Sequence, residues 1–192
     1  MPLPDPQPRR ELHFRNIELR GFQREDGLFD IEGRLVDRKT YPFFRKGGDQ
    51  ETPPGTPLHD MWIRLVVDEN LVVRDVVAVT DASPWQICRE AVAPMAAVIG
   101  ERIKPGWTNM VKQRLGGAKG CTHLMELLMP LATAAFQTIH PVRTLRPDPL
   151  DREGRPIKID SCYAYASGTA IVRRFWPEFH TGPAKQPDLQ DL

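Results

Sequence analysis

The segment from residue 60 to residue 79 constrains the fold most, because it carries the alternation of a β-hairpin on both sides of one short turn. In "DMWIRLVV" (60–67) apolar side chains occupy every second position, and "LVVRDVVAV" (71–79) follows after the turn "DEN" (68–70). Such alternation is typical of a strand with one buried and one solvated face. The second run has valine on both faces, as expected of a more central strand. The segment therefore predicts an antiparallel strand pair.

A second hairpin is predicted closer to the N-terminus. The runs "ELHFRNIELRGFQ" (11–23) and "LFDIEGRLVD" (28–37) flank "REDG", whose glycine suits a hairpin turn. Apolar and charged residues alternate along the second run, which indicates one buried face. In the first run the apolar positions change phase between Phe14 and Ile17, which predicts a β-bulge.

After residue 81 the apolar residues take the spacing of helices. Ser83 followed by Pro84 is a helix-start signal, and "PGWTNMVKQRLGG" (105–117) predicts another short helix. The longest predicted helix is "CTHLMELLMPLATAAFQTI" (121–139), because its leucines recur on one helical face. Near the end, "DSCYAYA", "SGT" and "AIVRRF" (160–175) predict a third hairpin.

Strands that come first and helices that follow predict an α+β fold: an antiparallel β-sheet built from hairpins, helices packed on one face, and a C-terminal β-hairpin. For 192 residues we expect one domain, over residues 11–176. Residues 1–10 are expected to be a disordered proline-rich tail, and residues 177–192 a flexible C-terminal tail. The segments 41–57 and 140–156 are predicted to be long loops, which often act as lids or contact partners.

The charge balance restricts the partners. The 26 basic and 25 acidic residues give a formal net charge of +1, without the basic excess of a nucleic-acid-binding domain. No apolar run approaches the roughly 20 residues that a membrane helix needs, and "MPLPDPQPRR" lacks the apolar core of a signal peptide. We therefore expect a cytoplasmic protein that binds a small-molecule ligand or a partner protein, and no nucleic acid or membrane. A homo-oligomer remains open.

Polar side chains are predicted to converge at one end of the sheet. The turn at 68–70 places the start of one strand beside the end of the next, so residues 59–60 and 80–81 share that end. If the 121–139 helix also begins there, its first residues join them. The candidate site residues are His59, Asp60, Asp81, Cys88, Cys121 and His123.

One hypothesis for these residues is a metal site. The three cysteines are an odd number and are expected to be free thiols or ligands rather than a disulfide framework. Zinc or iron accepts thiolate, imidazole and carboxylate together, which predicts Asp60, Cys88, Cys121 and His123 as ligands. Cys121 and His123 lie roughly 200° apart around an ideal helix, so they share an ion only if Cys121 belongs to the helix cap.

Other interpretations of the same residues stay open. In an enzyme (a lyase or hydrolase acting on an anionic or aromatic small molecule), Cys121 would be a nucleophile or His123 a general base, with an aspartate orienting the imidazole. A helix N-terminus favours the thiolate form of a cysteine. Alternatively Cys121 is simply buried and inert, and the protein is a non-catalytic interaction module. Whether it is an enzyme stays undecided at this point.

The glycines before the long helix allow one more hypothesis. Gly117 and Gly120 precede a helix N-terminus, where backbone N–H groups bind anions, and Lys119 would add a positive charge. These residues would hold the carboxylate or phosphate of a small cofactor or substrate. The same glycines would equally end one helix and allow a tight turn into the next.

Three long stretches together resemble a bacterial family known as domain of unknown function 2889. They are "RGFQREDGLFDIEGRLVDRKTY", "HDMWIRLVVDENLVVRDVVAVTDASP" and "GERIKPGWTNMVKQRLGGAKGCTHLMELLMPLATAAFQTI", and the resemblance extends to "SCYAY" and "VRRFWPEF" near the end. It implies that the chain is one complete domain of this type, and it implies no activity.

The order of elements over about residues 60–140 is also similar to the U-type iron–sulfur scaffold proteins. In that likeness Cys88 matches the cysteine that follows the strands, and Cys121 with His123 matches the pair that opens the last helix. The scaffold's first cysteine has no counterpart, because His59 and Asp60 stand there, and its histidine and cysteine are adjacent with the histidine first. The likeness therefore implies a mononuclear metal site or a remodelled pocket rather than a sulfur-rich cluster.

Overall fold

The computed structural model of the chain describes residues 3–44 and 48–182, and its internal contacts divide the chain into two compact units, Met1–Pro141 and Val142–Leu192. This division lies inside the segment 11–176, which the sequence predicts to be one domain. The domain boundaries stay a prediction. Each unit is described by itself.

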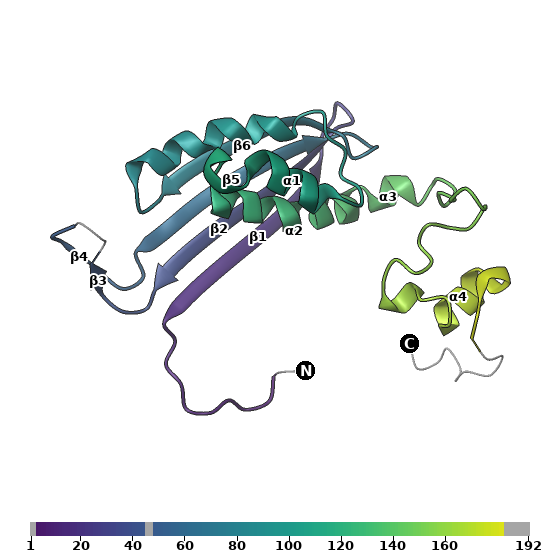
Figure 1. The fold of residues 1–192 in the computed structure, drawn as a ribbon, viewed down its shortest axis with the longest axis horizontal. Helices are drawn as coiled ribbons and strands as arrows, with labels where there is room; N and C mark the ends of the chain where they lie inside the picture. Colours follow the sequence, from purple (N-terminus) through teal and green to yellow (C-terminus); the bar gives the residue numbers. More distant parts are fainter. Residues whose placement is uncertain (1–2, 45–47, 183–192) are drawn as a thin grey trace. The chain divides into compact units, whose positions relative to one another are not determined.

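The first unit contains an antiparallel sheet of four long strands in the order β1-β2-β5-β6 (Figure 1). The strands are β1 (His13–Gln23), β2 (Phe29–Lys39), β5 (Pro57–Val67) and β6 (Val73–Ala82). They are the strands of the two predicted hairpins, and the two hairpins join through β2 and β5. β6 is therefore an edge strand, and the more central position predicted for it is wrong. A small second sheet, β3 (Phe43–Phe44) with β4 (Glu51–Thr52), lies in the connection between them.

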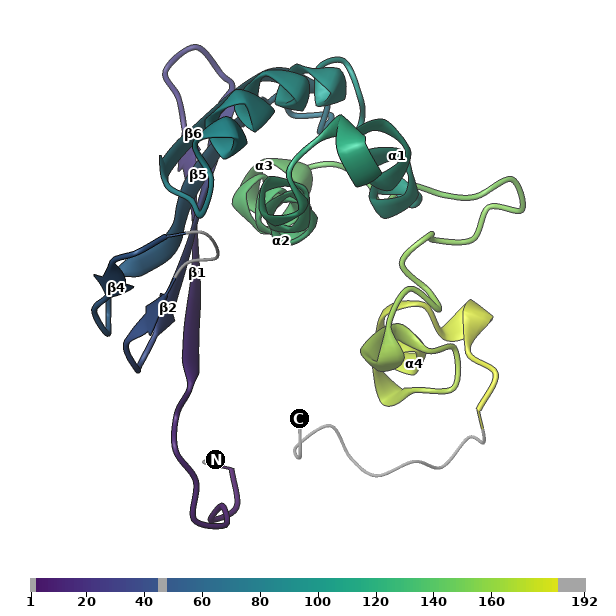
Figure 2. The same ribbon diagram turned by 60° about the vertical axis from the view of Figure 1, so that its left-hand side comes forward.

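Helices of the first unit cover one face of this sheet, as Figure 2 shows with the sheet almost edge-on. They are η1 (Gln86–Val98), α1 (Trp107–Leu115), η2 (Gly117–Lys119) and α2 (Thr122–Thr138), where η marks a 3₁₀ helix. α2 packs on β1, β2 and β5, and η1 packs on β6. The predicted α+β fold with helices on one face is confirmed.

The core lies between the helices and the inward face of the sheet. On β2 the odd-numbered residues from Phe29 to Asp37 are buried and face inward, and the same alternation continues across β5. α2 buries its predicted stripe, namely Leu124, Leu127, Leu128, Leu131 and Ala135. Gly33 lets this helix approach closely, because a Cβ there would lie 3.1 Å from Leu131 Cδ2.

β1 pairs with β2 in one unbroken register, so the predicted bulge between Phe14 and Ile17 is wrong. The change of phase has another cause. Phe14 and Phe22 occupy the open face of the sheet, whereas Ile17 and Leu19 occupy the inward face. An edge strand with apolar residues on both faces gives the same pattern as a bulge.

The second unit contains no strand pair where the C-terminal β-hairpin was predicted. The described residues there form η3 (Tyr163–Tyr165), α4 (Ala170–Phe175) and η4 (Pro177–Phe179). α3 (His140–Arg143) lies where the chain passes between the units. The hydroxyl of Thr169 accepts a hydrogen bond from Val172 N at 3.4 Å and so caps α4. A short apolar run does not distinguish a strand from a helix. Here the N-cap residue Thr169 favours the helix.

Candidate functional site

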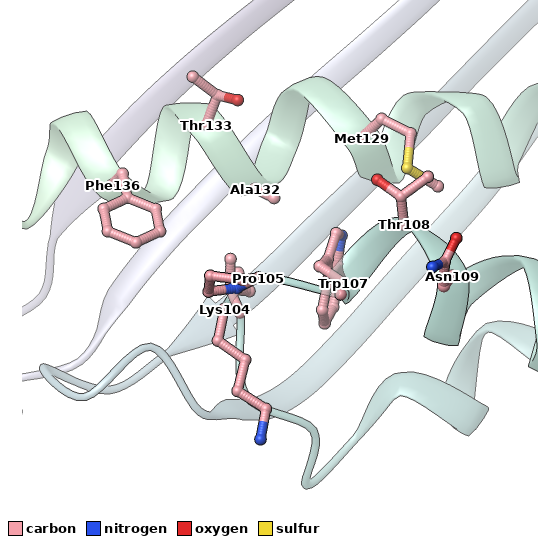
Figure 3. Close-up of a pocket in the computed structure, with 11 residues that line it drawn as sticks. Lys104, Pro105, Trp107, Thr108, Asn109, Met129, Ala132, Thr133 and Phe136 are labelled. Carbon is pink, nitrogen blue, oxygen red and sulfur yellow. The ribbon is translucent and has the colours of Figure 1, made fainter. Parts of the chain in front are cut away.

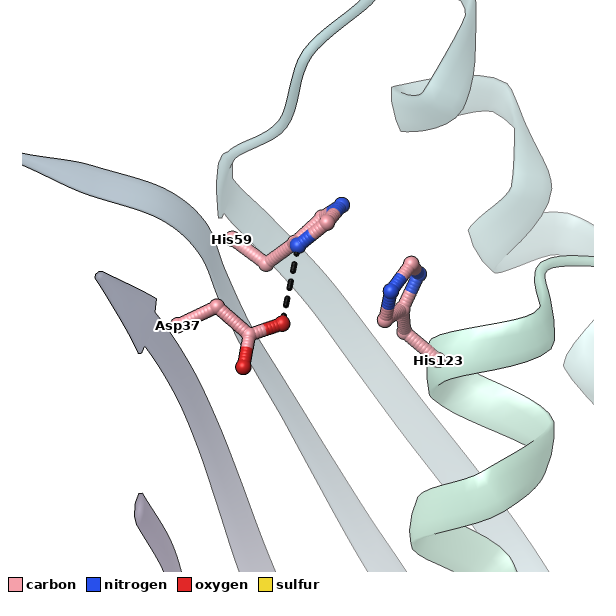
Figure 4. Close-up of side chains that lie close together, drawn as sticks. All are labelled: Asp37, His59 and His123. Carbon is pink, nitrogen blue, oxygen red and sulfur yellow. Dashed lines mark hydrogen bonds and ion pairs between the residues drawn. The ribbon is translucent and has the colours of Figure 1, made fainter. Parts of the chain in front are cut away.

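The sheet pairing and the start of α2 bring Asp37, His59 and His123 together (Figure 4). Asp37 and His59 are directly opposite each other on β2 and β5, and both face inward. His123 is in the first turn of α2. One possible ligand atom from each residue lies within 4.8 Å of the other two. Three chain segments far apart in sequence thus meet at one end of the sheet.

Asp37 is the anchor of this cluster. Its side chain is 2% exposed, and Arg15 holds it through two parallel hydrogen bonds of 2.7 and 2.8 Å. His13 Nε2 lies 3.3 Å from the same carboxylate. Burial raises the pKa of Asp37, but the hydrogen bonds and charges of Arg15 and His59 outweigh it, so the pKa is lowered. Asp37 is therefore an ionised carboxylate at neutral pH.

His59 and His123 stack on each other, with ring centroids 3.7 Å apart and a tilt of 32°. Burial lowers the pKa of His59, and Asp37 offsets this only in part. Burial also lowers the pKa of His123, and repulsion from Arg15 and from a protonated His59 adds to the effect. Both imidazoles are therefore neutral at pH 7, the state in which histidine binds metals or acts as a base.

The contact with Asp37 fixes the tautomer of His59. Nδ1 of His59 lies 2.9 Å from Asp37 Oδ2, and an ionised carboxylate only accepts hydrogen bonds. The proton is therefore on Nδ1, and Nε2 carries the free lone pair. A carboxylate that orients a histidine in this way is a common feature of metal sites and of catalytic histidines.

Cys121 lies beside this histidine pair. It is the N-cap of α2, with the extended backbone angles φ −86° and ψ 129°. Its Sγ lies 3.9 Å from Nδ1 of His123. The structure thus places Cys121 in the cap and next to His123, which is the arrangement that a shared ion requires.

Asp60 does not join the cluster. Neighbouring strand residues point to opposite faces, so His59 faces inward and Asp60 faces the open side. There the Asp60 carboxylate accepts two hydrogen bonds from Arg34, at 2.9 and 2.7 Å. Asp81 accepts a hydrogen bond of 3.2 Å from Trp62 Nε1 on the same open face.

Cys88 is half-buried in η1 and is not part of the described Asp37–His59–His123 group. The aspartate beside His59 and His123 is therefore Asp37, and not Asp60 as predicted. Its signal was the alternation of β2, which places Asp37 on the buried face two residues after Leu35.

The glycine-rich turn has structural tasks of its own. Lys119 Nζ donates a hydrogen bond of 2.9 Å to the carbonyl of Gln113 near the end of α1. Gly117 has a φ of +65°, which favours glycine. A Cβ on Gly120 would lie 3.0 Å from the carbonyl oxygen of Leu115. Anion binding by these three residues stays a prediction.

Two hollows of the surface lie elsewhere. One, of about 500 Å³, runs between the start of α1 and the second half of α2, and Trp107, Met129 and Phe136 line it (Figure 3). The other is a shallow hollow on the open face of the sheet beside Trp62 and Val79. The loop 41–57, expected as a lid, leaves the sheet at the end that carries Asp37, and its residues 45–47 lie outside the described residues.

The lowered pKa values predict a pH-dependent stability. As the pH falls below about 6.5, the unfolded chain takes up protons on His59 and His123 before the folded protein does. The unfolding free energy therefore keeps its full value above that pH. It decreases as the pH is lowered further, by at most about 1.4 kcal/mol per pH unit for each histidine. Urea unfolding with a chelator between pH 7.5 and 5.5 measures this.

The control for this prediction replaces a histidine that lies outside the cluster. His59→Gln together with His123→Gln should flatten the pH dependence, whereas His140→Gln, at an exposed position, should leave it as it is. An unchanged slope in the double variant would show that other groups are responsible.

Comparison with known proteins gives one family match, and it lies within the first unit. The family model "Protein of unknown function (DUF2889)" matches residues 13–137. The match includes all the residues of the cluster, and it ends before the segments around residues 161–179 that the resemblance was expected to include. Searches of curated proteins and of solved structures found no match. Among the described residues, no helix is long and apolar enough to cross a membrane.

Proposed function

The chain belongs to the DUF2889 family of proteins of unknown function, and we propose that its site binds one transition-metal ion, zinc or iron. The ligands are Nε2 of His59, Nδ1 of His123 and the thiolate of Cys121. Asp37 is a positioning residue in this proposal, because Arg15 and His59 already occupy both of its oxygens. The observation that carries the proposal is the meeting of two neutral imidazoles beside a thiol.

The spacing of Cys121 Sγ and His123 Nδ1 suits a shared metal ion. Zinc bonds of about 2.3 Å to sulfur and about 2.05 Å to nitrogen, at a tetrahedral angle, set the two ligand atoms roughly 3.6 Å apart. Cys121 Sγ and His123 Nδ1 are 3.9 Å apart. A rotation of the Cys121 side chain closes this difference, and His59 must turn out of its stack on His123 for its Nε2 to reach the same ion. The set of two imidazoles and one thiolate also leaves a fourth position for water or a ligand.

The charges around the site are balanced when the ion is bound. A divalent ion and Arg15 contribute three positive charges. Asp37, the Cys121 thiolate and Glu126, whose Oε2 lies 2.8 Å from Arg15 Nη1, contribute three negative charges. Because burial makes unpaired charge costly, this neutrality supports a metal ion in a half-buried site.

The test uses the full chain purified without a metal-affinity tag. Elemental analysis should find about one equivalent of zinc or iron. With the metal removed, added zinc should slow alkylation of Cys121 by about tenfold or more, as measured by peptide mass spectrometry. Cys162 is exposed and serves as the internal control, because its alkylation should not change. A protein that is empty as purified, and whose Cys121 reacts equally with and without zinc, would rule the proposal out.

The contact between Cys121 and His123 favours a second candidate, a thiol-dependent enzyme. In it, His123 takes the thiol proton and Cys121 attacks the substrate, and Asp37 with His59 fixes the imidazole pair. The alkylation experiment separates the two. A nucleophile reacts quickly in the protein as purified and carries no metal, whereas a ligand is protected by its ion.

A further inference from the structure

One of the two edges of the sheet, β1, is a long strand without a second strand partner among the described elements of the first unit. β1 has 11 residues, ten of them exposed, and β2 is the one strand that pairs with it there. An edge of this length is normally shortened, bent by a bulge, interrupted by proline or guarded by charged side chains, because free backbone groups bind other strands. β1 has an unbroken register and contains no proline.

The backbone of β1 is arranged for a further strand. Arg24 N donates to the carbonyl of Leu28 at 2.9 Å and closes the hairpin. Residues of an antiparallel pair alternate between bonded and non-bonded positions. Counting back from Arg24, the even-numbered residues of β1 bond to β2. The odd-numbered residues therefore direct their N–H and C=O groups to the free edge.

We propose that the free edge of β1 binds the β1 of a second copy of this chain, antiparallel, about a twofold axis at Leu19. The two four-stranded sheets then form one continuous sheet, with the helices of both copies on the same side. Because the axis is perpendicular to the sheet, each residue lies opposite one of the same face.

The charges on the strand select this register. Glu18 and Arg20 both face the open side of the sheet, and within one chain Arg20 Nε donates to Glu18 Oε1 at 2.6 Å. With the axis at Leu19, each Glu18 lies opposite an Arg20 of the second copy, so four alternating charges form a ring. Opposite charges across paired strands are favourable, and like charges are unfavourable.

The neighbouring registers lose this complementarity. An axis at Glu18 places the two Glu18 carboxylates opposite each other, and an axis at Arg20 does the same to the two guanidinium groups. An axis at Ile17 leaves Glu18 opposite Asn16 of the second copy. Among these four registers, centred on residues 17 to 20, the strand is self-complementary in one, and this feature favours a second copy over an unrelated strand.

The test is the oligomeric state of the full chain, measured by sedimentation over a range of concentrations. The wild-type protein should form a dimer. Arg20→Glu places two carboxylates opposite each other and should raise the dimer dissociation constant by about tenfold or more. Glu18→Arg should do the same. The double variant Glu18→Arg with Arg20→Glu restores opposite charges between the two copies and should bind more tightly than either single variant.

The controls separate the strand from general charge effects. Lys112→Glu on α1 changes the net charge equally at an exposed position and should leave the dimer unchanged. Glu18 and Arg20 are themselves exposed, but within the chain they lie opposite Arg34 and Glu32 of β2, so urea unfolding of each variant must show that it is folded before its dimer is measured. A monomer at every concentration would refute the proposal, as would a dimer that is indifferent to Arg20→Glu or not restored by the double variant.

Discussion

Arg15→Leu is expected to lower the unfolding free energy by about 3 kcal/mol, because it leaves the buried carboxylate of Asp37 without its main counter-charge. Arg15 donates two hydrogen bonds to Asp37. Its third hydrogen bond, to Glu126, joins β1 to α2. Asp37 is 2% exposed, so water cannot replace these bonds. Urea unfolding of the two proteins at pH 7.5 measures the loss.

The matched control is Arg64→Leu on the open face of the sheet. Arg64 donates a hydrogen bond of 2.8 Å to Glu32 across β5 and β2, but the two side chains are 50% and 27% exposed. An ion pair in this setting contributes at most about 1 kcal/mol. If the two variants lose equal stability, burial is not what makes the Arg15 pair important.

A second measurement on Arg15→Leu shows whether the electrostatic reason is right. The charge of Arg15 contributes to the lowered pKa of both His59 and His123. Without Arg15, the negative charge of Asp37 also stabilises the protonated form of His59 more strongly. The pKa of His59 should therefore rise in the variant, and NMR titration of the imidazole should detect this. An unchanged pKa would indicate that the lost stability comes from packing alone.

Much of the first unit could be predicted because its signals are local. The alternation in the two hairpins depends on residues that are neighbours in sequence, and the structure forms β1, β2, β5 and β6 over the predicted runs. The leucine spacing likewise predicts α2. The second unit shows where this reasoning ends. The run "AIVRRF" is too short for its period to decide, and the capping contact of Thr169 makes it a helix.

The candidate site was predicted in part, for a related reason. His123 and Cys121 come from the cap of a recognisable helix, and His59 from the start of a recognisable strand. Asp37 was missed because its meeting with His59 depends on the pairing of β2 with β5, which are separated by a long connection. The hairpin register instead predicts Asp60, which lies with His59 at the same end of the sheet. In a strand, adjacency is what puts two side chains on opposite faces.

His123→Ala is expected to weaken zinc binding by about 100-fold or more, roughly 2.7 kcal/mol, because it removes the proposed ligand that contacts both of the others. Its Nδ1 is near Cys121 Sγ, and its ring is stacked on His59. Calorimetric titration of the full chain with zinc at pH 7.5 gives the affinity. His140→Ala is the matched control, since His140 is exposed and follows the opposite end of α2.

The series His123→Ala, Cys121→Ser and Asp37→Asn separates ligands from the residue that positions them. Loss of either ligand should weaken zinc binding to a similar, large extent. Asp37→Asn keeps the shape of the side chain but removes its charge, and should weaken binding by about 10-fold to 100-fold, as expected of a group that orients a ligand. If Asp37→Asn weakens binding more than His123→Ala does, the carboxylate itself coordinates the ion. In that case Arg15 must release Asp37 when the metal binds, and the proposed ligand set is wrong.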